Sequence, residues 1–399
     1  MYATRINTDK ASLWKNRRPV IGRLDMELTE RCNNNCIHCC INRPADDRKV
    51  RDRELSTGEI KDILSEAAAL GCFTVRFTGG EPLLREDFEE LYLFARRLGL
   101  KVMLFTNATL ITPYLAELFA RIPPLEKIEI TVYGMTQRSY EGVTRNPGSF
   151  DAYRRGIDLL LEKRVPFIVK SAILPPNKGE MDDFESWAAA IPWMYKPPSY
   201  SMFFDLRCRR DSEEKNRLIE RLRLPPEEGL RMLTRRGEGY LKEMKQFCSK
   251  FMRPSGDKLF SCGSGLGGGC VDAYGVFQPC LLLRHPGTVY DLRRGTLREA
   301  MTEFFPRVRQ KRAANPDYLE RCARCFLKGL CEQCPAKSWM EHGTLDTPVD
   351  YLCRIAHAQA RFLGLLNEGE NAWEVDDWKE RIERFSGAAV GGELSAVSV

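Results

Sequence analysis

Short apolar strands alternate with amphipathic helices between residues 22 and 207, and this alternation constrains the fold more than any other feature. The first strand, residues 22–29, reads Gly-Arg-Leu-Asp-Met-Glu-Leu-Thr and alternates with period two. Ser56 and Glu59 form a capping-box pattern at the start of the first helix. The other predicted strands are residues 72–78, 101–106, 127–132, 165–174 and 200–206. Six β–α repeats imply parallel strands with right-handed crossovers. We therefore expect an α/β fold, a partial (β/α)6 TIM-type barrel with its site at the carboxyl ends of the strands.

The composition changes after the sixth strand. Residues 208–254 are helical and charged, and Pro225-Pro226 interrupts them, whereas residues 255–355 are rich in glycine and cysteine. A small-residue tail from Ser386 is expected to be disordered. The predicted organisation is a lead-in at 1–21, a barrel at 22–207, a helical connector at 208–254, a cysteine-rich domain at 255–355, and a helical region with the tail at 356–399.

The bulk properties exclude several classes of protein. The 399 residues are 43% hydrophobic, which supports a folded core. No run of 18 apolar residues predicts a membrane span, and the N-terminus has no apolar signal-peptide region, so a cytoplasmic protein is expected. The net charge of +6 is too diffuse to indicate nucleic-acid binding.

Fifteen cysteines are too many for an ordinary cytoplasmic protein, and metal binding is the leading explanation in a reducing compartment. Cys32, Cys36 and Cys39 have CxxxCxxC spacing directly after the first strand. A four-iron cluster otherwise takes four cysteines, so three would leave one iron open to a cofactor or substrate. A zinc site is the alternative, with His38 or Cys40 as a fourth ligand.

A second motif, Gly79-Gly80-Glu81-Pro82, directly follows the second strand. Adjacent glycines at a strand end allow close backbone approach to a ligand. Glu81 adds a carboxylate suited to an ammonium group. An ordinary turn is the alternative interpretation of these residues taken alone.

Together, the CxxxCxxC motif, the Gly-Gly-Glu-Pro motif and the six β–α units resemble the radical S-adenosylmethionine (SAM) superfamily over about residues 20–205. The resemblance implies a [4Fe–4S] cluster on Cys32, Cys36 and Cys39, the catalytic residues of such an enzyme. It also implies that S-adenosyl-L-methionine binds the open iron through its amine and carboxylate. Reductive cleavage of this cofactor would give a 5′-deoxyadenosyl radical that abstracts hydrogen from substrate.

The same resemblance assigns further cofactor-binding residues. The position between the second and third cysteines that is usually aromatic is His38, and the third-strand motif reads Thr106-Asn107-Ala108. The fourth-strand motif reads Thr131-Val-Tyr133-Gly134, in which Tyr133 replaces the usual acid. With Lys170 on the fifth strand, the implied cofactor-binding set is His38, Gly79, Gly80, Glu81, Asn107, Thr131 and Lys170.

Eight more cysteines lie within the C-terminal part, enough for two fully ligated four-iron clusters. Structural zinc sites are the alternative, because CxxC pairs serve both metals. The arrangement resembles the SPASM domain of radical-enzyme maturases, with x2 rather than x3 between Cys331 and Cys334. The resemblance implies one auxiliary cluster on Cys262, Cys270, Cys280 and Cys334, and a second on Cys322, Cys325, Cys331 and Cys353. We interpret the intervening glycines, 263, 265 and 267–269, as a flexible wrap around a cluster.

The resulting hypothesis is a radical SAM/SPASM enzyme, an oxidoreductase-like maturase that crosslinks, oxidises or excises part of a ribosomally synthesised peptide. The expected cofactors are S-adenosyl-L-methionine and three [4Fe–4S] clusters. The expected partners are a peptide or protein substrate and an external electron donor such as a flavodoxin or ferredoxin. Because only 31 residues precede Cys32, recognition of a leader peptide would need a separate leader-binding protein or another surface of this chain. Asp205 and Arg207 are candidates for substrate contact.

Three alternatives remain. A small-molecule radical SAM dehydrogenase or epimerase would share the barrel motifs. A sulfatase-maturing enzyme would carry an aspartate directly after its third SPASM cysteine, where this chain has Leu281 after Cys280. A passive multi-cluster electron carrier would not need the three-cysteine motif with its adjoining Gly-Gly-Glu-Pro.

Overall fold

The computed structural model describes residues 20–235 and 237–387, so most of the predicted lead-in and the tail from residue 388 lie outside the described residues. The chain divides into two compact units. The barrel unit comprises the chain up to Leu222 together with Gly265–Leu281 and Thr288–Pro306. The cysteine unit comprises Arg223–Ser264, Leu282–Gly287 and the chain from Arg307 onward. The sequence-based domain limits stay predictions, and the compact units cut across the predicted cysteine-rich domain.

Six parallel strands form the centre of the barrel unit, and this confirms the α/β partial barrel. Their order in the sheet follows the chain, and each strand pairs in parallel with the next. The strands are β1 (Arg23–Thr29), β4 (Thr74–Gly79), β5 (Lys101–Thr106), β6 (Leu125–Val132), β7 (Phe167–Ala172) and β8 (Ser199–Ser201). The sixth strand is shorter than the seven residues expected at 200–206, because it begins one residue earlier and ends at Ser201.

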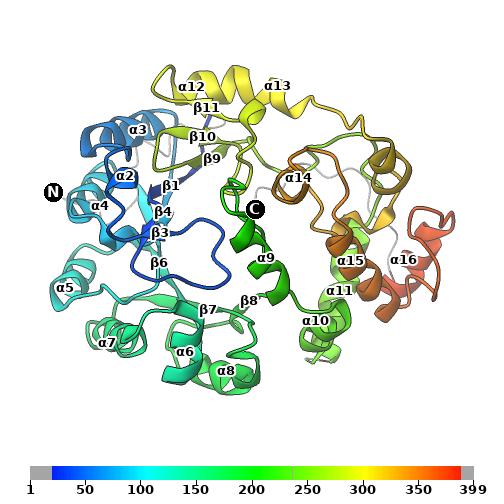
Figure 1. Cartoon of the computed structure of the whole chain (residues 1–399), viewed down its shortest axis with the longest axis horizontal. Helices are drawn as coiled ribbons and strands as arrows, with labels where there is room; N and C mark the ends of the chain where they lie inside the picture. The colour runs from blue at the N-terminus through cyan, green and yellow to red at the C-terminus, as the bar shows by residue number, and fades with distance from the viewer. Residues whose placement is uncertain (1–19, 236, 388–399) are drawn as a thin grey trace. The chain divides into compact units, whose positions relative to one another are not determined.

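Helices cover the outer face of this sheet (Figure 1). They are α3 (Thr57–Ala69), α4 (Phe88–Arg97), α5 (Pro113–Arg121), α6 (Gln137–Thr144), α7 (Ser149–Glu162) and α8 (Met181–Ala189), with α9 (Glu213–Leu222) after the last strand. Ser56 and Glu59 form the predicted capping box at the start of α3. Short elements in the same unit are α2 (Arg48–Arg51), η1 (Pro82–Leu84), η2 (Lys178–Glu180), β2 (Arg31–Cys32) and β3 (Arg43–Pro44).

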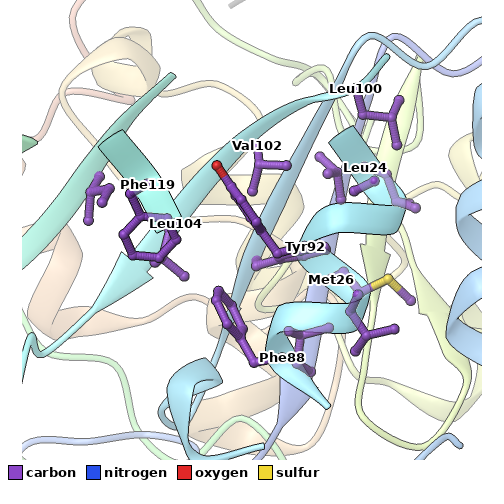
Figure 2. Close-up of a cluster of buried hydrophobic side chains, with 14 of the residues drawn as sticks. Leu24, Met26, Phe88, Tyr92, Leu100, Val102, Leu104 and Phe119 are labelled. Atoms are coloured by element: carbon purple, nitrogen blue, oxygen red, sulfur yellow. The ribbon is translucent and has the colours of Figure 1, made fainter. Parts of the chain in front are cut away.

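Alternate strand residues build the hydrophobic core between sheet and helices. Leu24 and Met26 on β1 are fully buried, as are Phe77 on β4 and Tyr92 on α4. Figure 2 shows Leu24 and Met26 beside the aromatic side chains of α4, with Phe119 of α5 in the same cluster. Because side chains alternate along a strand, the polar residues between these positions face the inside of the barrel, where the site lies.

A later segment extends the sheet beyond β1. Strand β9 (Gly268–Val271) pairs in parallel with β1, and Asp25 lies opposite Cys270. Strands β10 (Val276–Gln278) and β11 (Tyr290–Asp291) follow in antiparallel order. The expectation of a flexible wrap is wrong for Gly268 and Gly269, which lie in this strand. A Cβ atom on Gly268 would lie 2.3 Å from the carbonyl oxygen of Arg23, so only glycine allows this close strand contact.

The cysteine unit is mainly helical and has its own core. Its elements are α10 (Pro226–Thr234), α11 (Glu238–Phe251), η5 (Tyr318–Cys322), η6 (Phe326–Gly329), α14 (Pro335–His342), α15 (Asp350–Phe362) and α16 (Trp378–Ser386). Cys248 and Phe326 are fully buried there with Ala360 and Ile382. The remaining helical segments within the described residues are η3 (Pro286–Thr288), α12 (Leu297–Glu299), η4 (Ala300–Phe304) and α13 (Phe305–Arg309). Across residues 20–235 and 237–387, no helix is long and apolar enough to span a membrane.

Candidate active site and auxiliary metal centre

The three motif cysteines lie on one loop at the carboxyl end of β1, as predicted. Cys36 is buried, and Cys32 and Cys39 are half-buried. Two backbone hydrogen bonds attach this loop to the end of α6, from Asn35 N to Thr144 O at 2.9 Å and from Ile37 N to Val143 O at 3.0 Å. The barrel therefore holds the three thiols at the edge where its active site is expected.

Burial controls the acidity of these thiols. It raises the pKa of Cys36 to about 12, and it also raises the pKa of Cys32 and Cys39. The Glu81 carboxylate adds to the effect at Cys32, and Cys40 adds to it at Cys39. Thiolates are the metal-binding form, so positive charge from bound iron would favour deprotonation here. The donor set fits an iron–sulfur cluster.

Glu81 connects the second motif to this loop. Its side chain is fully buried and accepts hydrogen bonds from Thr106 Oγ1 at 2.8 Å, Asn107 N at 2.8 Å and Leu83 N at 3.1 Å. Burial raises its pKa to about 7. The Asn107 side chain in turn donates to Asn33 Oδ1 at 2.9 Å and lies 3.9 Å from Cys32 Sγ. Glu81 and Asn107 are thus brought together beside Cys32.

The two glycines of that motif have a specific packing role. A Cβ atom on Gly79 would lie 2.1 Å from Thr29 O, and one on Gly80 would lie 2.2 Å from Arg31 O. Both distances are far inside van der Waals contact. The close approach that the glycines allow is to the end of β1, which carries the cysteine loop, so they set the position of the loop against β4.

His38 lies in an aromatic environment. Its ring centroid is 5.5 Å from that of Tyr133 and 5.1 Å from that of Phe204. Burial lowers its pKa to about 4, so the imidazole is neutral near pH 7. Its Nδ1 atom is buried and has no hydrogen-bond partner among the described residues. A neutral ring with an unpaired nitrogen fits a purine-containing cofactor.

Thr131 and Lys170 lie opposite each other on β6 and β7. The Lys170 ammonium forms an ion pair with Glu129 and lies 4.0 Å from the centroid of the Phe105 ring. The structure therefore gives Lys170 two partners from the protein itself, and its contact with a cofactor stays a prediction, as does that of Thr131.

Sequence reasoning missed a polar network that holds the cysteine loop from the other side. Lys215, on α9, hydrogen-bonds to Asn42 Oδ1, and Arg207 donates to Asn42 O at 3.3 Å. Arg207 is 3% exposed and pairs with Asp211 at 2.7 Å. The Arg207 guanidinium is therefore buried and paired within the protein, so it is not exposed for the predicted contact with substrate. The only sequence signal for this network was the position of Lys215, near the start of the helix that follows the last strand.

Four cysteines of the C-terminal part meet in the cysteine unit. Cys322, Cys325, Cys331 and Cys353 line one cavity of about 30 Å³, together with Arg321, Lys328 and His357. Burial raises the pKa of Cys322 and Cys325 to about 12 and that of Cys331 to about 11. Neighbouring cysteines contribute to the same rise in pKa. Four sulfur donors around one cavity fit the second predicted auxiliary cluster.

The other four predicted ligands are divided between the units. Cys270 and Cys280 belong to the barrel unit, whereas Cys262 and Cys334 belong to the cysteine unit. Their common cluster stays a prediction.

The fold and the site define a class: an enzyme that carries an iron–sulfur cofactor on a partial β/α barrel. Residues 26–189 match the family model described as the Radical SAM superfamily. The chain therefore contains a radical SAM domain at residues 26–189 and is an enzyme.

Curated relatives support the same family. An AdoMet-dependent heme synthase of Methanosarcina barkeri is 26% identical over 335 residues, which are 79% of this chain and 92% of the relative. The mycofactocin maturase MftC of Mycolicibacterium smegmatis is 33% identical over 167 residues, 42% of this chain and 41% of the relative. This chain thus spans less than half the length of the maturase in that match.

A solved structure extends the likeness to the whole fold. The structure of anSMEcpe with bound AdoMet and the Cp18Cys peptide is similar with a TM-score of 0.56 at 14% identity, over 92% of this chain and 99% of that chain.

Proposed function

We propose that this enzyme uses S-adenosylmethionine and three [4Fe–4S] clusters to modify a peptide by hydrogen abstraction. The observation that carries the radical chemistry is the convergence of Cys32, Glu81 and Asn107 at the end of the parallel strands. When bound, the first cluster and S-adenosylmethionine supply one-electron reductive cleavage to a 5′-deoxyadenosyl radical.

The residues have distinct roles in this proposal. Cys32, Cys36 and Cys39 hold the cluster, and Glu81 fixes Asn107 beside it through the hydrogen bond to its backbone N–H. His38 offers its unpaired nitrogen to the cofactor. Gly79, Gly80 and the other expected cofactor contacts complete the set. Burial of the site excludes water, which would otherwise quench a reactive intermediate.

The cavity in the cysteine unit supports the auxiliary part of the proposal. Cys322, Cys325, Cys331 and Cys353 supply four sulfur ligands, the number that closes a four-iron cluster. A closed cluster has no free iron for substrate, so it transfers electrons. A SPASM domain with a second cluster on Cys262, Cys270, Cys280 and Cys334 completes the proposal, and a flavodoxin or ferredoxin would be the external donor.

The peptide substrate is supported by the likeness to MftC, a maturase, and to anSMEcpe, whose structure contains a peptide. The test is co-expression with candidate precursor peptides followed by mass spectrometry. A mass change that depends on Cys36 would support the proposal. An unmodified set of peptides, together with turnover of another substrate, would refute it.

A tetrapyrrole is the second candidate substrate. The AdoMet-dependent heme synthase matches over 92% of its own length, far more than the maturase does. The reconstituted enzyme should therefore also be incubated with an iron porphyrin such as Fe-coproporphyrin III. Conversion of the porphyrin with formation of 5′-deoxyadenosine would select this candidate over the peptide.

A further inference from the structure

We infer that Arg321 and His357 are positioning residues that raise the reduction potential of the cluster proposed for the cysteine unit, by donating hydrogen bonds to the sulfur of Cys353. The ligands proposed for this cysteine-unit cluster are Cys322, Cys325, Cys331 and Cys353. The inference rests on the proposed function, because it requires that cluster. It goes beyond that function by naming side chains that tune the cluster without binding iron themselves.

The sulfur of Cys353 lies within reach of two nitrogen donors. Cys353 is near the start of α15, and its Sγ atom lies 3.6 Å from His357 Nδ1 and 3.8 Å from Arg321 Nη2. Because sulfur is larger than oxygen, hydrogen bonds to it are longer than those between nitrogen and oxygen. A thiolate bound to iron carries no proton, so it can only accept. Both contacts would thus be donor hydrogen bonds to a cluster ligand.

The hydrogen bonds of His357 fix which ring nitrogen carries the proton. The backbone N–H of Ala372 donates to His357 Nε2 at 3.2 Å. A nitrogen that accepts a hydrogen bond has no proton of its own, so the proton of the neutral imidazole is on Nδ1. Nδ1 lies 2.9 Å from the Cys353 carbonyl oxygen and 3.6 Å from its sulfur, so this proton is shared between the two. The ring is 6% exposed and is therefore held as a donor toward Cys353.

The guanidinium of Arg321 is held in place by three other side chains. Its Nη1 atom lies 3.3 Å from each carboxylate oxygen of Asp317, and its Nη2 atom lies 2.9 Å from Asp350 Oδ1. Its Cζ atom lies 5.1 Å from the centroid of the Trp373 ring. The same tryptophan packs edge-to-face against His357, with centroids 5.4 Å apart. Because both donors are already held by the protein, little conformational entropy opposes their hydrogen bonds to the sulfur.

The effect on the cluster follows from the charge on the sulfur. Reduction adds one electron to the cluster and increases the negative charge on its thiolate ligands. Hydrogen bonds become stronger when the acceptor or the donor is charged, so these two bonds stabilise the reduced state more than the oxidised state. Hydrogen bonds to the sulfurs are among the factors that set cluster potentials. Arg321 and His357 should thus make the cysteine-unit cluster easier to reduce, which suits the electron transfer proposed for it.

Arg361 provides a matched control for Arg321. Both arginines line the same open cleft of the cysteine unit, and their side chains are 32% and 25% exposed. Arg361 also faces a carboxylate, that of Glu368 at 3.7 Å, but it has no hydrogen bond to a cysteine among the described residues. Arg321→Met and Arg361→Met therefore each remove one positive charge, and only the first removes a donor to Cys353.

The experiment is an anaerobic redox titration of the reconstituted full-length enzyme, monitored by electron paramagnetic resonance. The cysteine-unit cluster is identified as the reduced signal that Cys325→Ala lacks. The wild type is compared with Arg321→Met, Arg361→Met and His357→Phe. The last of these keeps an aromatic ring against Trp373 but removes the Nδ1 donor.

The expected result is a loss of reduced cluster in the two donor variants. At a fixed applied potential, we expect Arg321→Met to lower the ratio of reduced to oxidised cluster about tenfold and His357→Phe about threefold, a tenfold change being about 59 mV for one electron. Arg361→Met should change the ratio less than about twofold, because salt screens an exposed charge. An unchanged ratio in Arg321→Met or in His357→Phe would overturn the inference. Equal losses in Arg321→Met and Arg361→Met would also overturn it.

A second measurement applies if the donor variants hold too little iron to titrate. Wild-type enzyme is prepared with a heavy nitrogen isotope only in the arginine guanidinium groups and, in a separate sample, only in the histidine rings. Both samples are examined by pulsed electron paramagnetic resonance. Coupling of the labelled nitrogen to the reduced cysteine-unit cluster in both samples supports the inference. Absence of the coupling in either sample overturns it.

Failure of this inference can be distinguished from failure of the proposed function. If the wild type and Cys325→Ala had the same reduced signals and the same iron content, the cysteine-unit cluster would be absent, and the auxiliary part of the proposed function would be refuted together with the inference. If Cys325→Ala lacks a signal whose potential is the same in the wild type, Arg321→Met and His357→Phe, only this inference is refuted.

Discussion

The two cysteine sets of this protein are built in different ways. The three cysteines of the barrel unit come from one loop of eight residues, and β1, β4 and α6 hold that loop. The four cysteines of the cysteine unit come from segments up to 31 positions apart, between Cys322 and Cys353, and surround a cavity. A pre-positioned loop with three sulfurs suits a cluster that keeps one iron open. A four-sulfur cavity among helices suits a closed cluster, and its contribution is expected to be electron transfer.

The largest expected effect is the loss of S-adenosylmethionine cleavage in Cys36→Ala, which tests the cluster of the barrel unit separately from the electron-transfer cluster. Cys36→Ala removes one of only three ligands, so S-adenosylmethionine cleavage should fall at least about a thousandfold. Iron should fall by about four atoms per chain, the content of one cluster. Product analysis for 5′-deoxyadenosine and an iron assay measure the two quantities. Cys72→Ala is the control, because Cys72 is buried and belongs to neither cysteine set. This variant should contain as much iron as the wild type. Full cleavage by Cys36→Ala would contradict the assignment of the open cluster.

Cys325→Ala tests the other half of the comparison. It should also remove about four iron atoms, but cleavage of S-adenosylmethionine should persist because the barrel site is untouched. Modification of substrate should fall at least about tenfold, since the electron path is interrupted. Cleavage and substrate turnover are measured on the same sample. If cleavage were lost as completely as in Cys36→Ala, the division of labour between the two sets would be wrong.

Gly80→Ala tests whether the barrel pre-positions its loop. A Cβ atom there would lie 2.2 Å from Arg31 O, so the backbone beside Cys32 must move. Overpacking of this kind costs about 1–3 kcal/mol, and the variant should bind less iron at the first site. Gly179→Ala, at a position with nothing within 4 Å, is the control. Denaturant unfolding and iron content provide the readout. Equal behaviour of the two variants would argue that the loop is not held by this contact.

The smallest effect concerns Asp211, which attaches the segment after β8 to the loop. Desolvation opposes ionisation, but hydrogen bonding to Arg207 and the charges of Arg207, Arg43 and Arg209 lower its pKa to about 2. Its stabilising contribution is present above about pH 4 and is lost as the pH falls through about 2. Because the group is partly solvated, Asp211→Asn should cost only about 1–2 kcal/mol near pH 7. The difference from wild type should disappear toward pH 2. Unfolding free energies across pH measure this, and a pH-independent difference would contradict the ion-pair explanation.

Much of the barrel could be predicted because its signals are local. Period-two alternation and the capping box at Ser56 need only neighbouring residues, and both are confirmed. The pairing of β9 with β1 could not be predicted in this way. It joins residues about 245 positions apart, and Gly268 and Gly269 have low strand propensity. The missing side chains suggested a flexible segment, but at Gly268 the missing Cβ atom permits the close contact with Arg23, and at Gly269 it permits close contact with Gln278 on β10.

The site divides along the same line. The cysteine spacing and the Gly-Gly-Glu-Pro motif located the loop and Glu81, because each motif is contiguous in sequence. The network of Lys215, Arg207 and Asn42 depends on tertiary packing, so a single sequence gave no direct signal for it. Lys170 shows the opposite problem. The superfamily resemblance predicted a contact with the cofactor, whereas the structure shows an ion pair with Glu129.

The pairing of β9 with β1 has a consequence for electron flow. Cys270, an expected auxiliary ligand, lies on the strand next to the one that leads to Cys32, opposite Asp25. If Cys270 holds a cluster as proposed, the hydrogen-bonded sheet would be a rigid spacer between that ligand and Cys32. Tunnelling between redox centres depends steeply on their separation, so a spacer built from paired backbone keeps that rate constant while side chains elsewhere rearrange around a substrate.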